Sequence, residues 1–188
     1  NRVKRIAYAA SFGVSQWEFS NEDTDVCREL LKKFNAISVR EDSAIDLIKN
    51  KLGRDDAIHV LDPTMLLSKE HYNNLRESEK IPDSPGNLNV YVLDKTPEKD
   101  KLVRQIEVKL QLKAFEVLPV KKINEQKVTK DNIEDFVYQN PAVWIRGFQD
   151  ANFVVTDSFH GTVFSILHNV SFIVIGNSER GLSRFQSL

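Results

Sequence analysis

The sequence has little cysteine, little net charge and no long apolar run, and each shortage excludes a class of protein. A single cysteine in 188 residues cannot build a disulfide framework. The 26 basic and 27 acidic side chains leave a formal net charge of -1, so nothing favours nucleic acid or an anionic membrane as a partner. No run approaches the roughly 20 apolar residues that span a bilayer, and the first residues lack a signal-peptide pattern. We therefore expect a protein of the cytoplasmic type that is neither inserted nor secreted.

The cysteine and the chain ends carry two further expectations. Cys27 lies in an amphipathic helical pattern, which predicts a small buried side chain rather than a reactive thiol. The chain starts without methionine, enters a strand-like run almost at once and stops without a helix stop signal. We therefore expect a fragment of a larger protein.

Apolar runs of strand length alternate with helical patterns along the chain, which predicts an α/β protein with mainly parallel sheets. The predicted strands span residues 3–10, 36–40, 57–61, 88–93, 115–120, 153–156 and 172–175. The predicted helices span residues 25–34, 43 to about 52, 97–112 and 162–168, with two more beginning near 129–131 and at 141. Residues 68–87 are polar and contain Pro82, Pro85 and Gly86, which is typical of a helical turn followed by a linker. We therefore predict two α/β domains, 1–67 and 88–188, joined by a linker, 68–87.

Two apolar groups in the second half share predicted helix faces, and we expect the second of them to pack in the core. The first is Ile133, Phe136 and Val137 on one helix face, and the second is Trp144, Ile145 and Phe148 on another.

Ligands of open α/β sheets bind beyond the carboxyl ends of the strands, where loops meet helix N-termini. His160 stands out there, because an imidazole just before a helix can hold or pass a proton near a bound anion. Gly161 would let the backbone approach a ligand closely. Alternatively, Asp157 or Ser158 caps the helix and His160 bonds a buried carbonyl group. The five-residue pattern leaves both interpretations open.

Three arginines are also candidates. Arg40 follows a buried-looking strand and would bind a planar anionic ligand or form a salt bridge with Glu41 or Asp42, and the arginine alone favours the salt bridge. Arg180 and Arg184 would share a helix face, by default a solvated one.

The other histidines receive no function. His59 lies in a strand, His71 at a helix start, and His168 near a helix C-terminus, where its positive charge would be favoured. The sequence contains no Cys/His metal spacing, no Gly-rich phosphate loop and no nucleophile elbow.

Five segments, taken in order, resemble the polysaccharide pyruvyl transferase family across nearly the whole chain. They are Ala9-Ala10-Ser11-Phe12-Gly13, Ser38-Val39-Arg40-Glu41, Asp62-Pro63-Thr64, Asp157-Ser158-Phe159-His160-Gly161 and Arg180-Gly181-Leu182-Ser183-Arg184-Phe185. The resemblance implies Rossmann-like parallel sheets in a two-domain, glycosyltransferase-B-like architecture with the active site between the domains. Family members begin with a Gly- and Asn-rich segment, so it also implies that the first domain is incomplete here.

The activity implied by the resemblance is transfer of a pyruvyl group from phosphoenolpyruvate to a sugar of a bacterial cell-surface polysaccharide or its precursor. No metal and no cofactor beyond this donor are implied. A lipid-linked saccharide acceptor would bring the protein to the inner face of the membrane.

The resemblance also gives the candidate residues roles. His160 is the implied general acid, and Arg40 the implied ligand of the donor's carboxylate or phosphate. Arg180 and Arg184 are further anion contacts, while Ser11 and Ser158 add hydrogen bonds. The alternatives are a nucleotide-sugar glycosyltransferase, a catalytically silent relative that binds a saccharide or a partner protein, and an unrelated α/β protein in which the motifs only cap helices.

Overall fold

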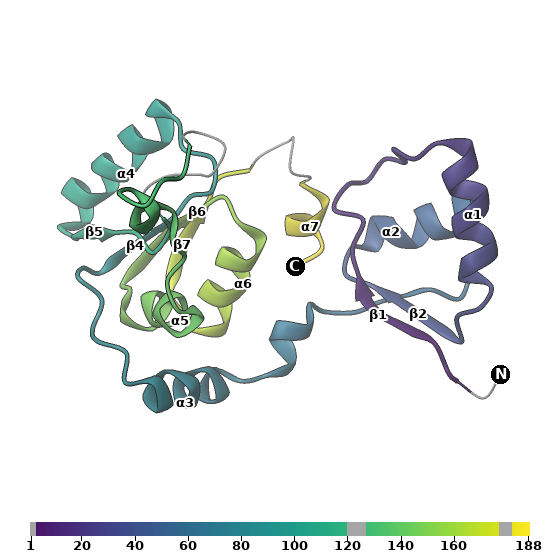
Figure 1. Ribbon diagram of the computed structural model, residues 1–188, viewed down its shortest axis with the longest axis horizontal. Coiled ribbons are helices and arrows are strands. Elements are labelled where there is room, and N and C mark those ends of the chain that lie inside the picture. The colour runs from purple at the N-terminus through teal and green to yellow at the C-terminus, as the bar shows by residue number, and fades with distance from the viewer. Residues whose placement is uncertain (1–2, 120–126, 177–181) are drawn as a thin grey trace. The chain divides into compact units, whose positions relative to one another are not determined.

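A computed structural model describes residues 3–119, 127–176 and 182–188 (Figure 1). The strands in these residues pair in parallel and form two sheets, with strand orders β1-β2-β3 and β5-β4-β6-β7. This confirms the predicted α/β class with parallel sheets. The chain divides into two compact units, a first unit of residues 1–66 and 176–188 and a second unit of residues 67–175.

The first unit begins with alternating strands and helices, and the end of the chain adds a short helix. Its elements are β1 (Ile6–Ala10), α1 (Asn21–Leu31), β2 (Ala36–Val39), α2 (Asp42–Leu47), the π-helix η1 (Ile48–Leu52), β3 (Ile58–His59), the 3₁₀ turn η2 (Pro63–Leu66) and α7 (Ser183–Gln186). Helix α1 starts four residues before the predicted position because Ser20 caps it, accepting a hydrogen bond from the Asp23 N–H. Gly53, with φ 73°, ends η1 as predicted.

The core of the first unit lies between β2 and the helical segment α2–η1. Its buried members are Ile37, Val39, Ala44, Ile48, Leu52 and Ala57. Strand β1 contains an irregularity, because its register to β2 shifts between Ala7 and Ala10 and Ala9 has φ 51°. The Ser38 hydroxyl accepts a hydrogen bond from the Ala9 N–H at 2.9 Å. Such a bulge redirects the chain immediately before Ser11.

The second unit is a parallel sheet with helices on both faces. Its elements are α3 (Lys69–Glu79), β4 (Leu88–Tyr91), α4 (Pro97–Leu110), β5 (Ala114–Phe115), the 3₁₀ turn η3 (Ile133–Phe136), α5 (Pro141–Asp150), β6 (Phe153–Thr156), α6 (Phe159–Leu167) and β7 (Ser171–Val174). As predicted, Thr96 caps α4 ahead of Pro97.

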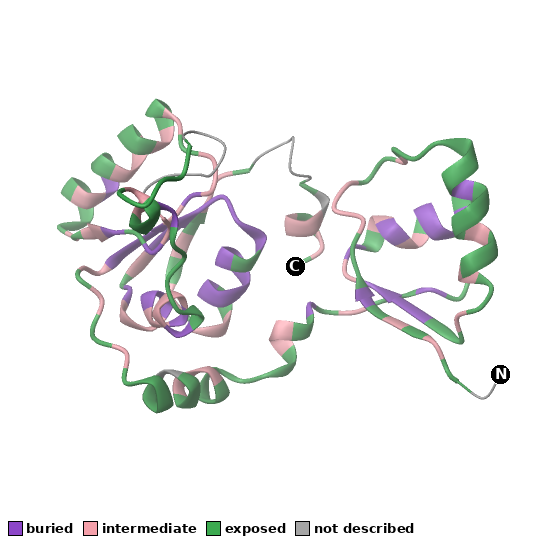
Figure 2. Ribbon diagram, viewed as in Figure 1, coloured by how far each residue is buried: buried purple, intermediate pink, exposed green. Residues whose placement is uncertain are grey.

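Alternate residues of the central strands face opposite layers. Leu88 and Val90 of β4 pack with Ile106 of α4. The next residue of β4, Asn89, lies instead beside Gly147 of α5, and the aromatic residues of α5 and α6 pack on that same face. Burial along the central strands and α6 is visible in Figure 2. A sheet covered on both faces is the usual context for parallel strands.

Residues 68–87, which we expected to act as a linker, are packed into the second unit. Tyr72 of α3 contacts the Phe164 ring edge-on, with centroids 4.9 Å apart. The Ser84 N–H donates to Asp150 at 2.8 Å, and Arg146 forms an ion pair with Asp83. The observed units therefore differ from the predicted boundaries both here and at residues 176–188, which belong to the first unit.

Two sequence predictions are wrong, one about burial and one about a helix. Cys27 is exposed, because α1 places Thr24, and not Cys27, in the buried position. The segment predicted as a helix face is a short 3₁₀ turn in which Phe136 is buried but Ile133 and Val137 are half exposed. In the part of the chain that the structure describes, no helix is both long and apolar enough to cross a membrane.

Candidate functional site

His160 is the second residue of α6, immediately after the carboxyl end of β6, and its side chain is exposed. The sequence predicted a helix beginning at Thr162, with His160 before it. The helix begins earlier because Ser158 caps it, its hydroxyl accepting a hydrogen bond from the Gly161 N–H at 3.4 Å. His160 therefore projects from the first helical turn, and Ser158 has the capping role that was one of the two open interpretations.

Asp157 does not cap the helix. It is fully buried, and its carboxylate accepts hydrogen bonds from the Leu93 N–H at 2.7 Å and the Asp94 N–H at 3.1 Å. The Lys99 ammonium lies 2.7 Å from the same carboxylate and also donates to the Asp94 carbonyl oxygen at 2.7 Å. These contacts, which we call the Asp157–Lys99 clamp, hold the loop after β4 beside the β6–α6 turn.

Gly161 leaves no space for a ligand at its Cα atom. A Cβ atom there would collide with the Thr156 hydroxyl and lie 3.1 Å from the Tyr91 ring. Glycine is therefore required at this position because the Thr156 and Tyr91 side chains pack closely against it.

A cavity of about 370 Å³ opens beside His160 in the second unit. It is lined by Tyr91, Val117, Leu118, Tyr138, Gln139, Pro141, Trp144 and His160. Burial raises the pKa of the Tyr91 phenol, and the nearby Tyr138 phenol and Asp157 carboxylate reinforce the rise against a hydrogen bond with Trp144. Tyr91 therefore stays protonated and neutral at physiological pH.

Trp144 has a different environment from the core position that the sequence predicted. Ile145 and Phe148 are buried as expected, but Trp144 is half-buried and lines this cavity. Its inner side packs edge-on against Phe148 and Phe164, with ring centroids 4.7 and 4.6 Å away. Trp144 thus joins the core to the cavity wall.

Arg40 of the first unit is paired with Asp62. Its side chain is mostly buried, and its partner is not Glu41 or Asp42, the two residues suggested by sequence proximity. Burial raises the pKa of Asp62, but hydrogen bonds from Thr64 and from Arg40 outweigh it and hold that pKa below its ordinary value. The pair links the turn after β2 to the segment after β3.

Glu41, beside Arg40, is completely buried and accepts a hydrogen bond from the Ser11 hydroxyl. This contact joins the ends of β1 and β2, which are neighbours in the sheet. The Ser11 hydroxyl, which was predicted to donate a hydrogen bond to a ligand, donates its hydrogen bond to Glu41 in this structure.

Arg184 lies in α7 against the turn that follows β1. Its guanidinium is 3.9 Å from the place a Cβ atom on Gly13 would occupy, and Gly13 has φ 80°. The Ser187 hydroxyl donates to the Asp42 carboxylate at 3.0 Å, which ties α7 to the start of α2. Arg184 is therefore half-buried at the carboxyl edge of this sheet and does not lie on a fully solvated helix face. Arg180 lies outside the described residues.

Residues 1–179 match the family model described as polysaccharide pyruvyl transferase. The chain belongs to the polysaccharide pyruvyl transferase family. No curated protein and no solved structure matches it. Membership implies a transferase that passes a pyruvyl group to a polysaccharide.

Within this family member, each unit gathers part of the predicted residue set. The first unit brings Ser11, Arg40 and Arg184 to the carboxyl edge of its sheet, and the second unit presents His160 beside the cavity. Sequence reasoning missed Lys99 and the cavity residues other than His160. Tyr91 is the last residue of β4, and its place at the end of a strand was a signal that could have identified it.

Proposed function

We propose that this chain acts in the transfer of a pyruvyl group from phosphoenolpyruvate to two hydroxyl groups of a saccharide in a bacterial cell-surface polysaccharide or its precursor. The observation that carries the proposal is the family match over residues 1–179. The two parallel sheets are compatible with a pair of Rossmann-like domains of the glycosyltransferase-B type.

The chemistry requires one proton donor. Protonation of the C3 methylene carbon of phosphoenolpyruvate leaves a cationic centre at C2, which a first saccharide hydroxyl attacks while losing its proton. A second hydroxyl then displaces phosphate from C2, loses its proton and closes the cyclic ketal. The products are the ketal and phosphate, and no oxidant or reductant is required.

We assign the proton transfer to His160. Its imidazole is exposed on the first turn of α6, where it is accessible to a substrate, and an imidazole changes charge near neutral pH. The N-terminal end of a helix also favours anionic groups, which suits a donor with a carboxylate and a phosphate.

We assign anion binding to Arg40, with Arg180 and Arg184 as further contacts. A guanidinium can bind a carboxylate or a phosphate through two parallel hydrogen bonds, and Arg40 lies directly after β2, at a strand end. Ser158 accepts a hydrogen bond as the helix cap and still carries one proton to donate. Ser11 would have to give up its bond to Glu41 in order to donate to a ligand.

Calorimetric titration of the chain with phosphoenolpyruvate, without metal and beside a uridine diphosphate sugar, tests the proposal. We expect saturable binding of phosphoenolpyruvate that weakens at least tenfold in Arg40→Ala and is retained in Arg104→Ala, a matched exposed arginine on α4. Phosphate release in the presence of methyl glycosides should fall about 10²- to 10⁴-fold in His160→Ala, the range of a lost general acid.

The opposite results assign other functions. Binding of the nucleotide sugar alone would establish a glycosyltransferase, and binding of neither ligand would indicate a catalytically silent relative. Circular dichroism of each variant separates a lost ligand contact from lost folding.

A further inference from the structure

We propose that the cavity beside His160 binds a neutral saccharide ring by stacking. The inference rests on the proposed function, in which this saccharide is the acceptor of the pyruvyl group.

The cavity has the size and lining of a small-molecule site. Its volume of about 370 Å³ falls within the roughly 300–1,000 Å³ of ligand pockets in proteins. Three aromatic rings, Tyr91, Tyr138 and Trp144, line it together with Pro141 and two aliphatic side chains. Tyrosine and tryptophan combine an apolar ring with a polar group, which matches a pyranose with its apolar C–H faces and hydroxyl rim.

The described lining of the cavity suits an uncharged ligand. Among the described residues that line it there is no lysine, arginine, aspartate or glutamate. A neutral saccharide has no charge to desolvate, so it can bind against these residues without a charged partner. The polar members, Gln139 and His160, can exchange hydrogen bonds with hydroxyl groups.

The stacking surface is held in place before any ligand arrives. The Tyr91 and Trp144 rings meet edge-on with centroids 5.4 Å apart, and Trp144 is fixed from behind by Phe148 and Phe164. Rings fixed by packing lose little conformational freedom on binding. Tyr138 differs, because it is 73% exposed, lies between η3 and α5, and can be replaced without opening the core.

The position of His160 connects this subsite to the reaction. Its side chain contributes to the cavity lining, so a saccharide in the cavity would present hydroxyl groups next to the proposed proton donor. Tyr91, Tyr138 and Trp144 would therefore act as acceptor-positioning residues and take no part in proton transfer.

Saturation-transfer NMR of the chain tests the inference. Methyl β-galactopyranoside and methyl β-glucopyranoside are measured separately, and uridine is measured as the comparison ligand. We expect transfer to the C–H protons of at least one glycoside, reduced at least tenfold in Tyr138→Ala. The matched control is Tyr8→Ala, an exposed tyrosine of β1 in the first unit, which should leave the transfer unchanged. Absence of transfer to both glycosides, transfer to uridine alone, or equal transfer in Tyr138→Ala and the parent chain would overturn the assignment.

Phosphoenolpyruvate titration of the same variants separates this inference from the proposed function. Tyr138→Ala should bind phosphoenolpyruvate as the parent chain does, because donor binding is assigned to Arg40 and His160 and the Tyr138 side chain carries no charge. If phosphoenolpyruvate binds but the glycosides make no contact at Tyr138, the acceptor subsite is wrong and the proposed function stands. If the glycosides make this contact but phosphoenolpyruvate does not bind, pyruvyl transfer is wrong and the saccharide site stands.

Discussion

The two units use a buried aspartate in different ways. Asp62 of the first unit follows β3 and pairs with Arg40, a residue that itself stands at a strand end, after β2. Asp157 of the second unit follows β6 and pairs with Lys99, which lies within α4. The first cation is thus placed where ligands of parallel sheets bind, whereas the second is used to fix a loop.

This difference separates the chemistry of the two units. The charges of the Asp157–Lys99 clamp pair with each other, and the described residues that line the cavity beside His160 include three aromatic rings and no lysine, arginine, aspartate or glutamate. The first unit instead carries arginines at the edge of its sheet. The first unit thus offers cationic side chains, and the second unit offers an aromatic surface.

The largest effect is expected from breaking the Asp157–Lys99 clamp. Asp157→Ala leaves a mostly buried ammonium without its partner and removes the acceptor of two backbone N–H groups, so we expect a loss of about 3–5 kcal/mol in the free energy of unfolding. Urea denaturation followed by circular dichroism measures this loss.

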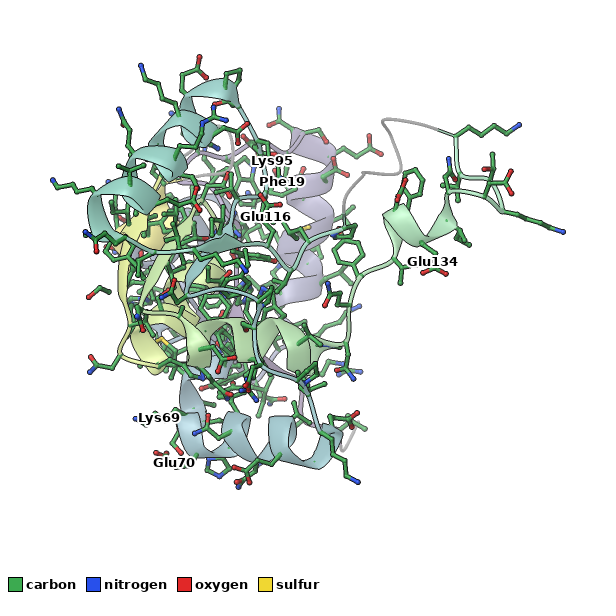
Figure 3. The ribbon with its side chains drawn as sticks, turned by 90° about the vertical axis from the view of Figure 1, so that its left-hand side faces the viewer. Phe19, Lys69, Glu70, Lys95, Glu116 and Glu134 are labelled. Carbon is green, nitrogen blue, oxygen red and sulfur yellow. The ribbon has the colours of Figure 1, made fainter. Side chains whose placement is uncertain are left out.

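A surface ion pair of the same unit provides the control. Lys95 and Glu116 are 2.5 Å apart but both exposed (Figure 3), so Glu116→Ala should cost no more than about 1 kcal/mol. Equal losses in the two variants would mean that the clamp contributes no more than a solvated pair.

A smaller loss is expected where glycine packs against β6. In Gly161→Ala the new methyl group meets Thr156, which cannot turn away freely because its hydroxyl donates to the Tyr91 carbonyl at 2.8 Å and accepts from the Ser158 N–H at 3.0 Å. Overpacking of this kind costs about 1–3 kcal/mol, offset in part by the better helix propensity of alanine. Thermal and urea unfolding of the variant measure the balance.

Gly147→Ala on α5 is the matched control. Its methyl group would lie 2.9 Å from the Asn89 amide nitrogen, the end of a side chain whose amide has no hydrogen-bond partner among the described residues. Because the Asn89 side chain can turn away from the new methyl group, Gly147→Ala should destabilise the protein by less than Gly161→Ala. The reverse order would show that the β6–α6 turn is looser than its contacts indicate.

The fold was largely predictable because the strands are bounded by local signals. Phe153–Thr156 was predicted to the residue, and the α/β class followed from alternating apolar runs and helical patterns. The segment 68–87 was not predictable in this way. It has the composition of a linker, and only tertiary contacts to α5 and α6 place its helix in the second unit.

The candidate site was predictable in its residues but not in their partners. His160 and Arg40 were found because polar side chains at strand ends follow from parallel topology. The Arg40–Asp62 pair joins residues 22 positions apart, and the Asp157–Lys99 clamp residues 58 apart, so local sequence favoured nearer partners. Trp144 was not recognised as a cavity residue because it shares a helical stripe with Ile145 and Phe148, which are buried in the core.

The smallest effect concerns pH and contrasts the two units again. Burial lowers the pKa of His168, the residue that directly follows α6. The hydrogen bond that Nδ1 donates to the Phe164 carbonyl oxygen at 3.0 Å raises this pKa by less, and the nearby Lys69 charge lowers it further. The sequence suggested that the helix C-terminus would favour a positively charged His168 ring, but the effect of burial is larger. A pKa lower in the folded than in the unfolded state means that the unfolded chain binds more protons, so stability falls as pH drops below about 6.5.

His168→Gln should flatten this dependence of stability on pH between pH 7 and 5, as measured by urea titrations. Asp62→Asn should leave it in place, because the lowered pKa of Asp62 affects stability only below about pH 4. A slope unchanged in His168→Gln would assign the acid sensitivity to another group.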